Sequence, residues 1–129
     1  MMDNRQEQTR NKWLEVLDKY KYDAHTPADD QIWSPRLECA SRDELTHIQN
    51  AKLSLVTPFL YENSDFYRRR FDRLDLIPSD IQSTDDLHKW PVIDKKEMME
   101  DVEKISPYGS YSTIDEKLWK ERGWMLFSS

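Results

Sequence analysis

Four helix-start signals constrain the fold of this 129-residue chain more than any other feature. Polar capping residues stand at Ser41, Thr84, Asp94 and Thr113, and at three of these positions a glutamate follows three residues later. In this spacing the first side chain accepts a hydrogen bond from a free N–H group, while the glutamate reaches back to the start of the helix. Apolar residues at helical spacing follow each signal. The sequence therefore predicts a mainly α fold.

The chain divides into an N-terminal part, residues 1–40, and a longer helical part, residues 41–129. We expect an amphipathic helix at 5–20, where apolar residues recur at helical spacing. The rest of the first part contains two prolines and predicts an extended connector. The helix that begins after Ser41 contains Pro58, which predicts a kink or break because proline lacks an N–H donor and clashes with the preceding turn.

An aromatic face is expected on the next helix, where Tyr67, Phe71 and Leu74 are spaced four and three residues apart. We expect this face to be buried against the preceding helix. The partner face predicted there is formed by Leu45, Ile48, Leu55 and Phe59.

The remaining elements are short. They are a turn at 77–81, a helix at 84–90 ended by Pro91, a helix at 94–104, a helix at 113–122 and a strand at Trp124–Phe127. An unpaired apolar strand leaves backbone groups free, and such edges recruit partners. We therefore expect either self-association through this C-terminal strand or its disorder.

Composition excludes several classes of function. Glycine occurs only at Gly109 and Gly123, whereas phosphate-cradling loops need glycine for tight turns and close backbone approach. A self-contained nucleotide enzyme is therefore not expected. The net charge of −6 disfavours a nucleic-acid partner. No apolar signal core and no run of about 20 apolar residues is present, so we expect a soluble, cytoplasmic protein without a membrane partner.

Arginines form the one basic cluster of the chain, at Arg68, Arg69, Arg70 and Arg73. A functional interpretation is contact with phosphate or coenzyme A, because guanidinium groups match phosphate geometry. The favoured interpretation is a solvated helix face. The expected partners of the arginines are then Asp65, Asp72 and Asp75.

Other reactive residues are scattered. His25, His47 and His88 lack a second ligand pair, so neither a metal site nor a general base is predicted. The single cysteine, Cys39, excludes an internal disulfide and has no neighbouring base that would make it a nucleophile. The charged segment 94–103 is typical of an exposed helix.

Spaced motifs from about Arg42 onward resemble the N-terminal region of phenylacetate–coenzyme A ligases and their relatives in the adenylate-forming, AMP-binding superfamily. In chain order the motifs are Phe66-Tyr67-Arg68, Ile77-Pro78-Ser79-Asp80-Ile81, Asp86-Leu87, Pro91 with Lys95, and Pro107-Tyr108-Gly109. The chain departs from the family pattern at Val92-Ile93-Asp94, where the family more often has an aromatic residue and threonines, and at Met98-Met99.

The resemblance implies that a full-length relative converts an aromatic carboxylic acid and ATP to an acyl-adenylate. Coenzyme A would then displace AMP from this intermediate. Magnesium would assist at the phosphates. Ser128 and Ser129 stand where the ATP-phosphate loop of the family begins. Residues 41–129 are then an incomplete ligase domain, truncated just before that loop, and the fragment itself binds no ATP, magnesium or coenzyme A.

Three interpretations follow. The first is a fragment of an acid–CoA ligase that is inactive alone and has the remainder of the ligase as its partner. The second is a naturally short, non-catalytic helical interaction module derived from such a ligase. The third is an unrelated helical binding protein that shares the pattern by chance.

Overall fold

The fold is built from helices and turns. The structure, a computed structural model, describes residues 3–22, 32–106 and 108–113, and within these ranges no strand occurs. The elements are α1 (Asn4–Lys19), α2 (Pro35–Glu38), α3 (Arg42–Asn63), α4 (Asp65–Arg73), α5 (Lys95–Lys104) and the 3-10 helices η1 (Pro78–Asp80) and η2 (Thr84–Lys89). The mainly α prediction is confirmed. The predicted helix 113–122 and strand Trp124–Phe127 lie outside the described residues.

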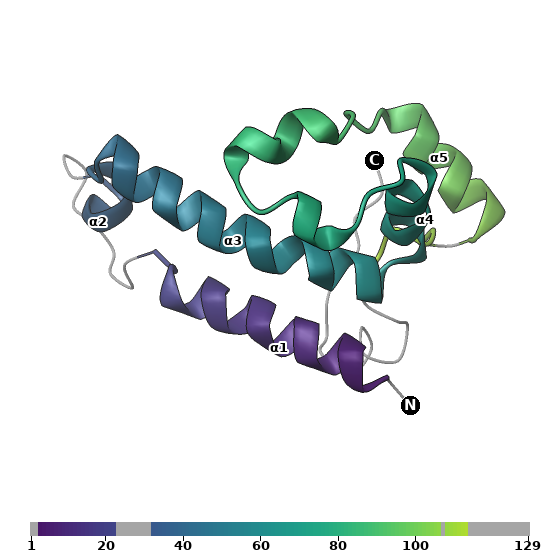
Figure 1. Ribbon diagram of the computed structural model, residues 1–129, viewed down its shortest axis with the longest axis horizontal. Helices are drawn as coiled ribbons and strands as arrows, with labels where there is room; N and C mark the ends of the chain where they lie inside the picture. Colours follow the sequence, from purple (N-terminus) through teal and green to yellow (C-terminus); the bar gives the residue numbers. More distant parts are fainter. Residues whose placement is uncertain (1–2, 23–31, 107, 114–129) are drawn as a thin grey trace.

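Helices α1 and α3 lie side by side and antiparallel, and the elements from α4 onward lie on the other side of α3 (Figure 1). In the described part of the chain, no helix is both long and apolar enough to cross a membrane.

Side-chain caps begin three of the helices. The hydroxyl of Ser41 accepts from the N–H of Glu44 at 3.2 Å, and the carboxylate of Asp94 accepts from the N–H of Glu97 at 2.7 Å, as predicted. Ser64, which the sequence analysis did not single out, caps α4. These caps satisfy N–H groups that have no partner inside the helix.

The connector is more ordered than expected. The short helix α2 occupies Pro35–Glu38, within the segment predicted to be extended. Pro35 stands in its first turn, where the missing N–H costs nothing because that group has no intrahelical partner. The carbonyl of Ser34 accepts from the N–H of Leu37 at 3.0 Å and that of Glu38 at 2.8 Å.

Of the kink or break predicted at Pro58, the break does not occur, because helix α3 continues through this residue. Tertiary contacts around the proline explain why. The neighbouring Thr57 is fully buried, and its hydroxyl lies 3.2 Å from the carbonyl oxygens of both Pro78 and Ile81. These contacts hold η1 against this part of α3, and their stabilisation offsets the hydrogen bond that Pro58 removes.

Apolar side chains are buried on both sides of α3. The fully or nearly buried ones are Val16, Ile48, Phe59, Phe66, Phe71 and Ile81. Trp13 of α1 stacks on Phe59 with ring centroids 6.3 Å apart. On the other side, the ring centroid of Phe71 lies 5.7 Å from that of Tyr61 in α3 and 4.8 Å from that of Trp90.

Burial of the aromatic face is confirmed in part. Phe71 has no exposed surface, whereas Tyr67 and Leu74 are half-buried. Its aromatic partner on α3 is Tyr61, which the helical spacing did not identify, while Phe59 faces α1.

Candidate functional site

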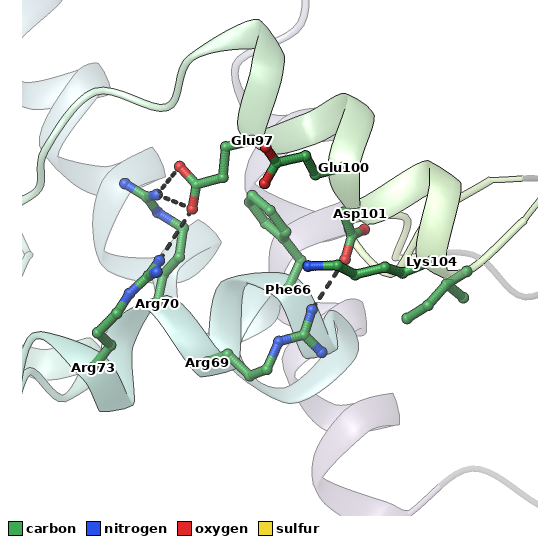
Figure 2. A pocket seen from close by; sticks show the side chains of 9 residues that line it. Phe66, Arg69, Arg70, Arg73, Glu97, Glu100, Asp101 and Lys104 are labelled. Carbon is green, nitrogen blue, oxygen red and sulfur yellow. Dashed lines mark hydrogen bonds and ion pairs between the residues drawn. The ribbon is translucent and has the colours of Figure 1, made fainter.

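A charged groove of about 530 Å³ lies between α4 and α5. Figure 2 shows arginines of α4 facing carboxylates of α5 across it. The lining residues are Phe66, Arg69, Arg70, Arg73, Glu97, Glu100, Asp101, Lys104 and Ile105. The groove contains three of the four arginines that the sequence singled out, so it is the candidate site.

Arg70 lines the charged groove and is buried, with 5% of its surface exposed. Its Nη1 donates to both carboxylate oxygens of Glu97 at 2.6 Å, and its Nη2 donates to the carbonyl of Pro91 at 2.8 Å. Arg73 adds a second contact to Glu97, at 3.0 Å. The expectation of a solvated arginine face is therefore wrong for Arg70.

The ion-pair partners of the groove arginines come from α5 rather than from the expected Asp65, Asp72 and Asp75. Arg69 donates to the Asp101 carboxylate at 3.0 Å and to the Ser110 hydroxyl at 2.8 Å. Periodicity within one helix cannot identify these partners, because they lie about 30 residues further along the chain.

The fourth arginine, Arg68, lies outside the charged groove. Its Nε and Nη2 donate to the carbonyls of Tyr61 and Glu62, each at 3.0 Å. Its guanidinium also lies 5.6 Å from the centre of the Tyr61 ring. Arg68 therefore satisfies the C-terminal carbonyls of α3, as cations near a helix C-terminus do.

The carboxylates of the groove are held in the charged form. Hydrogen bonds from Arg70 lower the pKa of Glu97, in spite of the opposing effect of burial. For Asp101 burial is the largest influence and on its own raises the pKa. Hydrogen bonds from Ser110, with the charge of Arg69, outweigh it and leave the pKa below its ordinary value. Both carboxylates are therefore ionised partners of arginines at neutral pH.

A further carboxylate, that of Asp86, accepts several hydrogen bonds at the start of η2. Asp86 accepts hydrogen bonds from the N–H of Gln82 at 3.2 Å, from the N–H and hydroxyl of Ser83, and from Lys89 at 2.7 Å. The hydrogen bond from Lys89, followed by that from the Ser83 hydroxyl, holds the pKa of Asp86 well below its usual range. The Asp-Leu motif thus has a structural reason: Asp86 is the third residue of η2 and completes a capping box with Ser83, the N-cap. The cap predicted at Thr84 therefore lies one residue earlier, and Thr84 is the first residue of η2.

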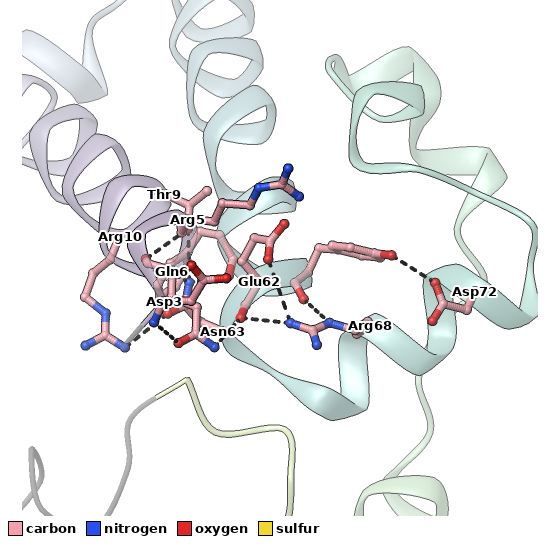
Figure 3. A network of polar contacts seen from close by, with 11 residues as sticks. Asp3, Arg5, Gln6, Thr9, Arg10, Glu62, Asn63, Arg68 and Asp72 are labelled. Carbon is pink, nitrogen blue, oxygen red and sulfur yellow. Dashed lines mark hydrogen bonds and ion pairs between the residues drawn. The ribbon is translucent and has the colours of Figure 1, made fainter. Parts of the chain in front are cut away.

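The end of α3 is joined to α1 by amide groups. Asn63 donates to Thr9 at 3.1 Å and accepts from Arg10 at 3.2 Å, and Gln6 donates to the Glu62 carbonyl at 3.0 Å (Figure 3). Sequence reasoning missed Asn63, because one asparagine at a helix end carries no periodic signal.

The remaining candidate residues show no catalytic arrangement. His47 lies 3.4 Å from the Tyr20 hydroxyl, and His88 lies 2.6 Å from the Asp85 carbonyl. The thiol of Cys39 is exposed and forms no disulfide. His25, Ser128 and Ser129 lie outside the described residues. Among the residues that are described, no group of three or more metal-binding side chains is positioned to hold an ion.

Known proteins similar in sequence are acid–CoA ligases. The chain is 37% identical to phenylacetate-coenzyme A ligase of Escherichia coli (strain K12) over 62 residues, which are 48% of this chain and 14% of that enzyme. It is 33% identical to the ligase of the same name from Aromatoleum evansii over 82 residues, which are 64% of this chain and 18% of that enzyme. No model of a known protein family matches the chain.

Solved structures agree with this relationship. The chain superposes on 2-hydroxyisobutyryl-CoA ligase in complex with 2-HIB-AMP and CoA with a TM-score of 0.67 and 27% identity, covering 75% of this chain and 21% of that one. A second structure of that ligase, in the postadenylation state with 2-HIB-AMP, gives a TM-score of 0.68 at 26% identity and covers 82% of this chain and 22% of that one.

The resemblance to phenylacetate–CoA ligases is thereby confirmed in sequence, and the fold is that of part of a related CoA ligase. In class, the described helices match a helical region of an adenylate-forming CoA ligase. The particular relatives are phenylacetate-coenzyme A ligases in sequence and 2-hydroxyisobutyryl-CoA ligase in structure. The chain spans less than a fifth of the length of the two sequence relatives.

Proposed function

We propose that this chain supplies the helical N-terminal part of an ATP-dependent carboxylic acid–CoA ligase that acts through an acyl-adenylate. The observation that carries the proposal is the agreement of sequence and fold: both comparisons lead to CoA ligases, and the structural match extends over 75% of the chain. The partner of the chain is then the remainder of the ligase. ATP, magnesium and coenzyme A are the reactants and cofactors of the complete enzyme.

An aromatic acid is the proposed substrate. The proposal rests on the sequence relatives, which at 37%, 33% and 25% identity are phenylacetate-coenzyme A ligases. The structural relative, a ligase named for an aliphatic hydroxy acid, is 27% identical. The motif Phe66-Tyr67-Arg68 lies where α4 begins, and its side chains pack within the chain. Phe66 is buried, and Arg68 binds carbonyls of α3. This motif therefore supports assignment to the family because its residues stabilise the helical fold.

The described residues do not fit a triphosphate. Their one glycine, Gly109, has a positive φ and lies against the Asp101 carboxylate, which repels phosphate. Each arginine of the charged groove already binds a carboxylate. We therefore expect the 129 residues alone neither to bind ATP tightly nor to release pyrophosphate.

A segment exchange tests the proposal. The matching segment of the Escherichia coli phenylacetate-coenzyme A ligase is replaced by the corresponding residues of this chain, and phenylacetate-dependent release of pyrophosphate is measured. The positive control carries the segment of the Thermus thermophilus enzyme, which is 25% identical to this chain. We expect both chimeras to be active, because the helices supply scaffold rather than catalytic groups.

A folded, soluble chimera that is inactive, beside an active Thermus control, would contradict the proposal and favour a non-catalytic interaction module. The isolated chain gives a second test, by pyrophosphate release with aromatic acids and by calorimetric titration of ATP. Acid-dependent release, or micromolar ATP affinity that survives added salt, would show that a nucleotide site exists within these residues.

A further inference from the structure

Residues 109–113, the strap, lie against α1, the start of α4 and the junction of α3 with α4. The Ser110 carbonyl accepts from the Phe66 N–H at 3.2 Å, and the Thr113 carbonyl accepts from Arg10 of α1 at 2.9 Å. The strap residues are half-buried, and the ring of Tyr111 makes an edge contact with Phe66 at 6.3 Å. The strap is thus attached largely through polar contacts, which open more readily than a packed apolar core.

Ser64 anchors the strap at the junction of α3 and α4. Its side chain is 2% exposed, and its hydroxyl lies 2.9 Å from the Ser110 carbonyl and 3.1 Å from the Tyr111 carbonyl. The same hydroxyl accepts from the N–H of Tyr67 and so caps α4. The strap therefore depends on a residue that also defines the start of a helix.

Asp101 of α5 makes two hydrogen bonds to the strap. Its carboxylate accepts from the Ser110 N–H at 2.5 Å and from the Ser110 hydroxyl at 2.6 Å, and Arg69 bridges the same two groups. Asp101 is 7% exposed, so water does not replace these bonds without local opening. Hydrogen bonds to a charged acceptor are stronger than neutral ones.

Gly109 makes the contact between Asp101 and the strap sterically possible. Its φ of +68° lies in the left-handed region, where residues with a side chain are strained. A Cβ atom at this position would lie 2.7 Å from the Asp101 carboxylate. The backbone and the carboxylate therefore approach each other at a distance that only glycine permits.

We propose that the strap opens as a unit while the helices stay folded, and that the carboxylate of Asp101 is the latch that holds it closed. This inference does not depend on the proposed ligase activity. Its failure would leave that proposal intact.

Amide hydrogen exchange of the full chain at neutral pH tests the latch. The reporters are the amides of Ser110 and Phe66, which bond to Asp101 and to the strap, and the Ser64 amide, which bonds to Leu60 within α3. In Asp101→Ala we expect exchange of the two strap reporters to rise about tenfold or more, because charge-assisted bonds are lost. Exchange at Ser64 should be unchanged. Glu103→Ala removes the same charge from an exposed position of α5 and should leave all three reporters unchanged.

A double substitution sharpens the test. Gly109→Ala should also speed exchange at the strap reporters, because its methyl group displaces the Asp101 carboxylate. The effects of Gly109→Ala and Asp101→Ala should be less than additive when combined, since either change opens the same latch. If Asp101→Ala fails to fold, Asp101→Asn, which keeps one acceptor oxygen, should give a smaller rise confined to the strap.

Unchanged exchange at Ser110 and Phe66 in the Asp101 variants would overturn the inference. An equal rise at the strap and at Ser64 would also overturn it, because Asp101 would then support the whole fold. Full additivity of the two substitutions would show that Gly109 and Asp101 act separately.

Discussion

The α1–α3 interface and the α4–α5 interface are held together by different chemistry. Between α1 and α3, Trp13 stacks on Phe59, Val16 is buried, and neutral amide groups around Asn63 join the helix ends. Between α4 and α5 the principal contacts are ion pairs, with Arg70 buried against Glu97. One interface thus depends on apolar burial and the other on charge.

The contrast between these interfaces shows that the role of each charged residue in a run depends on its partners in space. Three consecutive arginines have three different environments: Arg68 caps α3, Arg69 is half-exposed, and Arg70 is buried. Exposed ion pairs contribute little to stability, whereas a buried charge that loses its partner is costly. Adjacent residues of one type are therefore expected to differ widely when each is replaced.

The largest expected effect is a loss of stability on truncating an apolar side chain of the core. Phe71→Ala should lower the free energy of unfolding by about 3–5 kcal/mol, because the ring is fully buried between Tyr61 and Trp90. Chemical denaturation measures this change. Val92→Ala is the control, since Val92 is 92% exposed, and should change stability by less than about 0.5 kcal/mol. A loss below about 1 kcal/mol in Phe71→Ala would contradict the apolar packing described.

The charged interface is tested by Arg70→Ala, with an expected loss of about 1–3 kcal/mol. The reason is that Glu97 loses one of its two arginine donors, and the Pro91 carbonyl loses the Arg70 donor, in a partly buried site. Arg73→Ala is the matched control. It removes an arginine that is 65% exposed from the same glutamate, and should cost less than about 1 kcal/mol. Equal losses in the two variants would show that burial does not decide the strength of these pairs.

A smaller effect, about 1 kcal/mol, is expected for Asn63→Ala, which removes hydrogen bonds to Thr9, to the Gln6 carbonyl and from Arg10. The loss should depend little on salt between low concentration and about 1 M, because Asn63 carries no charge and forms no ion pair with Arg10. The loss in Arg73→Ala, in contrast, should shrink in high salt. Denaturation of both variants at the two salt concentrations measures the contrast.

The smallest expected effect is a change in acid sensitivity. The folded-state pKa of Glu97 is lowered, chiefly by Arg70, so its contribution to stability is complete above the ordinary pKa of 4.5 and is lost as the pH falls through the folded value. Glu97→Gln should therefore give a flatter profile of unfolding free energy below about pH 5. Asp86 titrates in both proteins, so its contribution cancels. Identical profiles would contradict the lowered pKa.

Local signals predicted much of the fold. The caps at Ser41 and Asp94 depend on residues three positions apart, and both were identified from sequence. The burial of Phe71 followed from helical spacing. The sequence predicted a kink or a break at Pro58, and the break does not occur because tertiary contacts of Thr57 outweigh a local rule. Helix α2 was not predicted, because a single turn has no periodicity.

The candidate site was less predictable than the fold. The arginine cluster was visible in the sequence, but its partners Glu97 and Asp101 are 27 and 32 residues away from the arginines they bind. Spacing along one helix carries no information about such pairs. The Pro-Tyr-Gly motif identified Gly109 in the sequence. Its contact with Asp101 could not be predicted without the fold.

We claim that three arginines of α4, Arg69, Arg70 and Arg73, bind α5 and so stabilise the fold. A double-mutant cycle of Arg70→Met and Glu97→Gln, measured by chemical denaturation at neutral pH, tests it most directly. We predict a coupling energy of about 1–3 kcal/mol, because the two side chains form a bidentate pair with one partner buried. A coupling energy below about 0.3 kcal/mol would show that the pair does not hold the helices together and would contradict the claim.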